Sequence, residues 1–172
     1  MSCSIPEHSD IPIHAVPPLP SGRQKPGATR LADLTTMGVG GEVRHLVEAQ
    51  SDHEIIAAVT AADEAGEPLL MLGGGSNILA DDAPFDGTVI RDMRSQITLT
   101  QEGGCEGANL RVVAGTSWDE LVVHTIENEW AGLEALSGIP GTVGAAPVQN
   151  IGAYGQEISS TVVRVQTWDR KT

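Results

Sequence analysis

Two widely separated glycine-rich segments constrain this chain most, because neither suits a regular helix or strand. The first, Gly-Gly-Gly-Ser-Asn at residues 73–77, directly follows an apolar run at residues 68–72. The second spans residues 137–155 and holds five glycines within 18 residues: Gly138, Gly141, Gly144, Gly152 and Gly155. Glycine permits backbone conformations in which successive N–H groups converge on an anion or let a large ligand approach closely. We therefore expect these two segments to form the functional site.

Each segment also has a purely structural interpretation. The first can be a turn between two strands, since glycine runs commonly end regular elements. It is not a Rossmann fingerprint, because Ile78 stands where the third glycine would fall and residues 81–84 interrupt the required helix. The second can be a structural loop, but long loops in compact domains are usually functional or disordered, and this one carries apolar anchors.

The charge and composition exclude several classes of protein. Ten Lys and Arg against 23 Asp and Glu give a net charge of −13, which argues against non-specific binding of nucleic acid. The apolar runs are far shorter than the stretch of about 20 residues that a membrane span needs, and no basic leader precedes them. Cys3 and Cys105 suggest neither a disulfide framework nor a thiolate metal site. We expect a soluble, cytoplasmic protein with no nucleic-acid or membrane partner.

Proline usage divides the chain into a tail and a folded part. Six of the ten prolines fall within the first 26 residues, in a stretch without sustained periodicity. Residues 1–28 are therefore predicted to form a flexible, proline-rich tail. Residues 29–172 are predicted to form the domain, with folded structure beginning near Leu31.

Hydrophobic periodicity predicts two helices and some six strands. Capping-box patterns start both helices, one from Ser51 to Glu54 and one from Ser117 to Glu120, and Gly66 ends the first. The predicted strands lie at residues 43–49, 68–72, 87–91, 97–101, 110–114 and 161–168, and residues 132–155 are predicted to be loop. Because helices and strands do not alternate strictly, the predicted fold class is α+β and not a doubly wound sheet.

No catalytic or metal-ligating group stands out among the side chains. The five histidines show no paired ligand spacing, so no metal site is predicted. Ser76 is followed by Asn77 and lies in no Gly-x-Ser-x-Gly elbow, which argues against a hydrolase. Glu134 lies just before the second glycine segment, where we expect a solvated carboxylate or one that braces the loop.

Taken together, the ordered motifs resemble the flavin domain of the UDP-N-acetylenolpyruvoylglucosamine reductase family. The matching residues lie at 34–40, 73–77, 132–134, 138–144 and 147–155, and they cover nearly all of the chain after the tail. The resemblance implies the FAD-binding fold of the vanillyl-alcohol-oxidase (PCMH-like) type. It implies a small lobe at about residues 29–78 and a larger lobe at about residues 79–172, with FAD between them.

The resemblance also implies which residues contact the cofactor. Residues 73–77 would line the FAD pyrophosphate, and residues 139–143 and 149–154 would surround the isoalloxazine and its linker. The expected FAD contacts are Gly73, Gly74, Gly75, Ser76, Asn77, Gly138, Ile139, Pro140, Gly141, Thr142, Val143, Gly144, Gln149, Asn150, Gly152, Ala153 and Tyr154. The Tyr154 ring has two interpretations, since it can face the flavin or pack on its own loop.

In that family NADPH reduces the flavin, which passes hydride to the enolpyruvyl double bond of a UDP-sugar and yields UDP-N-acetylmuramate for peptidoglycan. The family's catalytic arginine, serine and glutamate would lie beyond Thr172, and Ala145 and Ala146 stand where some relatives carry serines. We therefore expect a fold incomplete at its C-terminus, inactive alone, with residues 161–168 as an unpaired strand that associates through its edge. Two alternatives stay open: another flavin oxidoreductase of this fold, and a flavin-free binding remnant.

Overall fold

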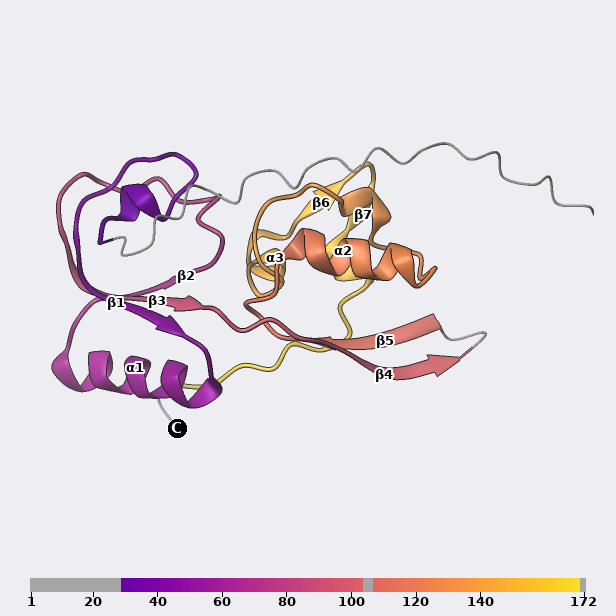
Figure 1. The fold of residues 1–172 in the computed structure, drawn as a ribbon, viewed down its shortest axis with the longest axis horizontal. Helices are drawn as coiled ribbons and strands as arrows, with labels where there is room; N and C mark the ends of the chain where they lie inside the picture. Colours follow the sequence, from indigo (N-terminus) through magenta and orange to yellow (C-terminus); the bar gives the residue numbers. More distant parts are fainter. Residues whose placement is uncertain (1–28, 104–106, 171–172) are drawn as a thin grey trace, which may run out of the picture.

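The computed structural model describes residues 29–103 and 107–170 (Figure 1). The tail predicted at residues 1–28 lies outside these ranges. The elements in chain order are η1 (Leu31–Asp33), β1 (Val43–Ala49), α1 (Asp52–Ala65), β2 (Leu69–Leu72), β3 (Phe85–Asp92), β4 (Ile97–Gly103), β5 (Gly107–Val112), α2 (Trp118–Glu127), η2 (Glu134–Leu136), α3 (Ala145–Gln149), β6 (Gly152–Ala153), β7 (Gln156–Glu157) and η3 (Ile158–Ser160). This mixture of helices and strands confirms the predicted α+β class.

A parallel three-stranded sheet in the order β1-β3-β2 forms the centre of the first lobe, which we define as residues 29–92. Val89 and Ile90 on the central strand are completely buried and point to opposite faces, as the period of two in a strand requires. On one face Val89 packs with Leu72 and with the residues around η1. On the other face Ile90 packs with α1, which covers the sheet (Figure 1).

The first predicted helix is confirmed with both of its ends. The Ser51 hydroxyl oxygen accepts a hydrogen bond from the Glu54 amide at 3.2 Å, and Gly66 ends the helix at a φ of +66°. The Glu54 carboxylate accepts a bond from the Gln50 amide, one residue before the position that a capping box uses. Within residues 29–103 and 107–170, no helix has both the length and the apolar character needed to cross a membrane.

The second lobe, residues 97–160, combines the β4–β5 hairpin with α2 (Figure 1). Its core gathers around Trp118, whose indole N–H donates to the Leu136 carbonyl at 2.9 Å. The helix is confirmed, but the predicted capping box is wrong because the Ser117 side chain accepts no cap hydrogen bond. Instead, the first helical amide, that of Trp118, donates to the Gly141 carbonyl at 3.1 Å. A long-range contact therefore replaces the local cap.

Two further predictions need correction. Residues 162–169 have no regular structure, and no described strand pairs with them, so the predicted strand at 161–168 is wrong. A strand forms only beside a partner that satisfies its backbone groups, and the β pattern alone does not supply one. Residues 132–155 are not entirely loop, because they include α3 and β6. The turn that starts α3 is closed by the amides of Ala145 and Ala146, which donate to the Thr142 carbonyl at 3.0 and 3.1 Å.

The pairing of β3 also indicates where the first lobe ends and the second lobe begins. β3 pairs with both β1 and β2, so it belongs to the first lobe even though it lies after residue 78. The buried core of the second lobe begins only after β3. We propose that the boundary lies at residues 93–96, between β3 and β4, later than the sequence indicated.

The two serines that precede helices give a matched test of capping. Replacing Ser51 by Ala should lower the free energy of unfolding by about 1 kcal/mol, because the Glu54 amide loses its acceptor. Replacing Ser117 by Ala should change it by much less, because that side chain caps nothing. Urea unfolding followed by circular dichroism measures both. Equal losses in the two variants would contradict the assignment.

Candidate functional site

The first glycine loop, residues 73–77, directly follows β2 and packs against residues 34–36. Of its three glycines, only Gly75 has a positive φ, of +71°. A side chain at Gly75 would collide with the Leu34 carbonyl, so glycine is required there for space as well as for conformation. The Thr36 amide donates to the Gly75 carbonyl at 2.9 Å. The loop is therefore held by backbone contacts with the segment before β1.

The second glycine loop, residues 138–144, lies along residues 114–118 at the start of α2. Besides the bond from the Trp118 amide, the Val143 amide donates to the Thr116 carbonyl at 2.9 Å. The Gly144 amide donates to the Ala114 carbonyl at 2.8 Å. A Cβ on Gly144 would lie 2.7 Å from the Ala114 Cβ, so only glycine permits this approach. Three backbone hydrogen bonds therefore fix the second glycine loop to the second lobe.

The two loops meet at their glycines. A Cβ added to Gly74 would lie 3.0 Å from the Gly141 Cα, which is closer than almost all real contacts of this kind. The Ser76 hydroxyl donates to the Pro140 carbonyl at 3.2 Å. A Cβ on Gly73 would lie 3.1 Å from the Thr142 hydroxyl oxygen. The structure therefore brings together the two segments that the sequence singled out.

Several backbone N–H groups at this junction remain available to a ligand. Among the described residues, the amides of Gly74, Ser76, Gly141 and Thr142 donate to no acceptor. All four residues are half-buried. Clustered N–H groups in glycine-rich loops bind anions without needing a basic side chain. The junction consequently has the chemistry of a phosphate site, which suits a chain with a net charge of −13.

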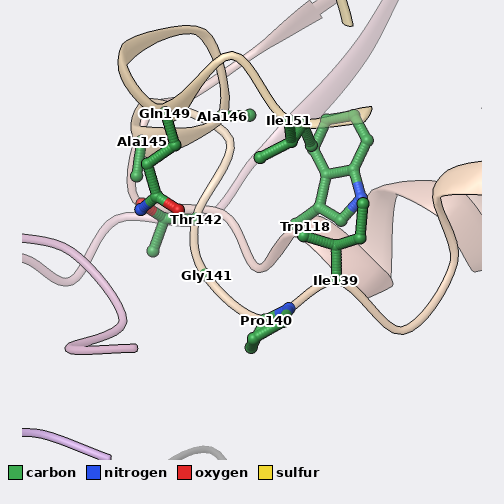
Figure 2. Close-up of a pocket in the computed structure, with 9 residues that line it drawn as sticks. All are labelled: Trp118, Ile139, Pro140, Gly141, Thr142, Ala145, Ala146, Gln149 and Ile151. Carbon is green, nitrogen blue, oxygen red and sulfur yellow. The ribbon is translucent and has the colours of Figure 1, made fainter. Parts of the chain in front are cut away.

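An open depression lies beside the second loop (Figure 2). Its lining is mostly apolar: Trp118, Ile139, Pro140, Gly141, Thr142, Ala145, Ala146, Gln149 and Ile151. Figure 2 shows the Trp118 ring beside Ile139 and Ile151, with Thr142, Ala145 and Gln149 on the other side of the view. The depression has no space for even a water molecule, so it is a shallow apolar surface and not a formed pocket.

Sequence reasoning named five of the lining residues and included Ile151 in the predicted range 149–154. It missed Trp118, Ala145 and Ala146. The helical spacing around Trp118 identified it only as a core residue, and it is indeed 1% exposed. Ala145 and Ala146 drew attention only as departures from the family pattern. The small size of these two residues, next to a glycine loop, was the signal that could have placed them in the lining.

Other predicted contacts lie beside the depression or support it. The Gly138 amide donates to the Asp119 carboxylate at 2.9 Å, so this glycine anchors the loop. Asn150 and Tyr154 have positive φ values of 46° and 51°. Tyr154 is 94% exposed, which rules out the interpretation that its ring packs on the loop. Gly152 and Ala153 form β6 and, like Asn77, are not among the lining residues.

The carboxylate of Glu134 braces the entrance to the second loop. It accepts a hydrogen bond from the Gly132 amide at 2.5 Å, which confirms the expected bracing role. Hydrogen bonds from its own backbone N–H and from that of Gly132 hold the pKa of Glu134 below its ordinary value. Because the folded-state pKa is lowered, this stabilisation is present at neutral pH and is lost as the pH falls through the lowered pKa. No group of three potential metal ligands occurs within the described residues.

The chain is similar to several known proteins. The family described as FAD binding domain matches residues 43–171. The chain is 54% identical over 140 residues to a UDP-N-acetylenolpyruvoylglucosamine reductase of Cutibacterium acnes, covering 81% of this chain and 37% of the relative. It is 47% identical over 142 residues to the protein of that name from Salinispora arenicola, covering 83% and 39%.

A solved structure of a protein with the same enzyme name is also similar to this chain. The crystal structure of UDP-N-acetylenolpyruvylglucosamine reductase from Thermus caldophilus matches with a TM-score of 0.56 and 32% identity, covering 74% of this chain and 43% of that one. The chain thus spans well under half the length of the relatives that it matches. The resemblance drawn from the ordered motifs and the FAD-binding fold that it implied are both confirmed. On the match over residues 43–171, this chain belongs to the FAD binding domain family.

Proposed function

We propose that this chain binds FAD where its two glycine loops meet, as part of a UDP-N-acetylenolpyruvoylglucosamine reductase. The approach of Gly74 to Gly141 carries the proposal, because it places two stretches of bare backbone side by side. Relatives that are 54% and 47% identical to this chain over 140 and 142 residues carry the name of that enzyme. The match to the FAD binding domain family supports the cofactor.

The residues at the junction fit the two chemical parts of FAD. Amides of Gly74, Ser76, Gly141 and Thr142 suit the anionic pyrophosphate, and Asn77 lies on the exposed side of the same loop. The apolar surface beside the second loop supports contact with one face of a flat ring system, but it is too shallow to enclose one. We place the isoalloxazine near residues 139–143 and 149–154, with the exposed Tyr154 ring available to it.

In this role the residues of the chain bind and orient the cofactor. Bound there, FAD would supply the hydride chemistry of the family, in which hydride from NADPH and a proton together saturate the enolpyruvyl double bond to give UDP-N-acetylmuramate. The second glycine loop, which is held by backbone hydrogen bonds to residues 114–118, would help to position the ring. The product serves peptidoglycan synthesis in the cytoplasm, and through it cell-wall biogenesis, cell shape and cell division.

Gly74 offers a direct test of the cofactor site. Replacing it by Val should lower FAD retention at least about tenfold, because the side chain pushes the second loop away from the first. The effect arises from this close approach and not from φ, which is positive at Gly75 and not at Gly74. Flavin fluorescence titration measures the dissociation constant.

A matched control is Gly66→Ala at the end of α1. Gly66, unlike Gly74, has a positive φ, and a Cβ there meets nothing within 4 Å, so the variant loses stability without disturbing the loops. It should retain FAD as the parent chain does. An unchanged affinity in Gly74→Val, or an equal loss in both variants, would contradict the assignment.

The chain as a whole should bind FAD without sustaining turnover. After the purified protein has been mixed with FAD and the free cofactor removed by gel filtration, the protein should keep the visible absorbance of oxidised flavin. It should not oxidise NADPH in response to the enolpyruvyl substrate, because proton transfer needs a positioned acid worth about 10²- to 10⁴-fold, and the resemblance places that serine beyond Thr172. Turnover comparable to that of a full-length relative would refute the second part, and absence of flavin binding would favour a flavin-free remnant.

We also propose that residues 162–168 form an association surface. Val163 is 88% exposed and Val165 56%, and Trp168 lies in the same irregular segment. Exposed apolar residues in a row favour contact with another chain or segment. Replacing Val163 by Glu should therefore reduce self-association in sedimentation velocity at high protein concentration. Identical sedimentation of the parent and the variant would remove this proposal.

A further inference from the structure

The junction between the two lobes is fixed by polar contacts around residues 92–96. The Arg94 guanidinium binds both oxygens of the Asp92 carboxylate, at 2.7 and 2.6 Å, and also pairs with Asp52 at the start of α1. Gly115 packs against this turn, because a Cβ there would lie 2.5 Å from the carbonyl oxygens of Asp92 and Arg94. The turn after β3 therefore has a defined position relative to the start of α2.

Thr116 lies where this junction meets the second glycine loop. The residue is 0% exposed. Its hydroxyl oxygen accepts a hydrogen bond from the Gln96 amide at 3.1 Å. Its backbone carbonyl accepts the bond from the Val143 amide, and its own amide donates to the Val113 carbonyl at 3.0 Å. One buried residue thus contacts both the junction and the loop.

The neighbours of Thr116 hold the loop in a different way. Ala114 and Trp118 contact it through backbone atoms, which many residue types could supply. At Thr116 the side chain makes the connection to Gln96, so the residue type matters there. Through β3, which pairs with β2, the junction is also connected to the strand that carries the first glycine loop.

We propose that Thr116 is a positioning residue that holds the second glycine loop in register with the first by tying it to the junction at Gln96. The inference rests on the proposed FAD site and names a determinant of that site outside both loops. Thr116 does not line the depression, so its effect is transmitted through Val143 and Gly141. Losing its hydroxyl leaves the Gln96 amide without this acceptor, while the Val113 amide still donates to the Gln96 carbonyl at 3.0 Å. The loop is therefore loosened at the junction and not detached from it.

Thr116→Val is the primary test, because valine keeps the shape of threonine and removes the hydrogen-bond acceptor. We expect the dissociation constant for FAD to rise about fivefold or more. Without FAD, hydrogen exchange at the Val143 and Gly144 amides should quicken relative to amides in β3. Thr116→Ser should restore both properties toward those of the parent chain. If Thr116→Val does not fold, Thr116→Ser against Thr116→Ala gives the same comparison on a smaller side chain.

Thr125→Val is the matched control. Thr125 is also buried in the second lobe, but its hydroxyl donates to the Val122 carbonyl within α2. That variant should lose stability while FAD affinity and loop exchange stay unchanged.

FAD affinity and loop hydrogen exchange, measured together, distinguish failure of the cofactor proposal from failure of the proposal for Thr116. If the parent chain binds no FAD, the cofactor proposal fails, and loop exchange alone decides the role of Thr116. If Thr116→Val keeps the exchange rates of the parent loop, or changes them only as Thr125→Val does, Thr116 is an ordinary core residue and the inference is overturned. Faster loop exchange in Thr116→Val alone, with rescue by serine, supports it.

Discussion

The approach of Gly74 to Gly141 is the contact on which the rest of the site depends. Gly74 has no room for a side chain, because a Cβ there would press against the Gly141 Cα, and Gly141 has a φ of +136°, which other residues rarely adopt. One loop follows a strand of the first lobe and the other belongs to the second lobe, so the contact exists only while the lobes keep their mutual placement. The Thr36 amide supports one side, and the backbone around Thr116 supports the other. Backbone hydrogen bonds in each lobe therefore hold the two glycines at this contact.

The sequence predicted those parts of the fold that local chemistry determines. Ser51 and Gly66 mark the ends of α1 because a cap and a left-handed residue act within one turn. The same reasoning failed at Ser117, where the pattern is present but the Gly141 carbonyl satisfies the first amide of α2. It failed again at residues 162–168, where a β-like pattern has no strand beside it in the described chain. Long-range partners decided both cases, and sequence spacing does not reveal them.

For the site, too, the sequence predicted the local features and not the long-range contacts. The glycine-rich residue types identified both loops, and the order of the motifs identified the family. The meeting of Gly74 with Gly141 could not be predicted, because it depends on the packing of the lobes. Trp118 shows the limit most clearly, since its helical spacing indicated a core residue and gave no sign that it also lines the depression. A buried side chain can serve the core and a ligand surface together.

The order of strands in the first sheet has a consequence for how the chain folds. β1 and β2 come first along the chain, joined by α1, yet they do not pair with each other because β3 lies between them. During synthesis the facing edges of β1 and β2 therefore stay unpaired until β3 has been made and pairs with both strands. Unpaired parallel edges of this kind are slow to close and prone to join other chains. The strand order therefore leaves the edges of β1 and β2 open to other chains until β3 can pair with them.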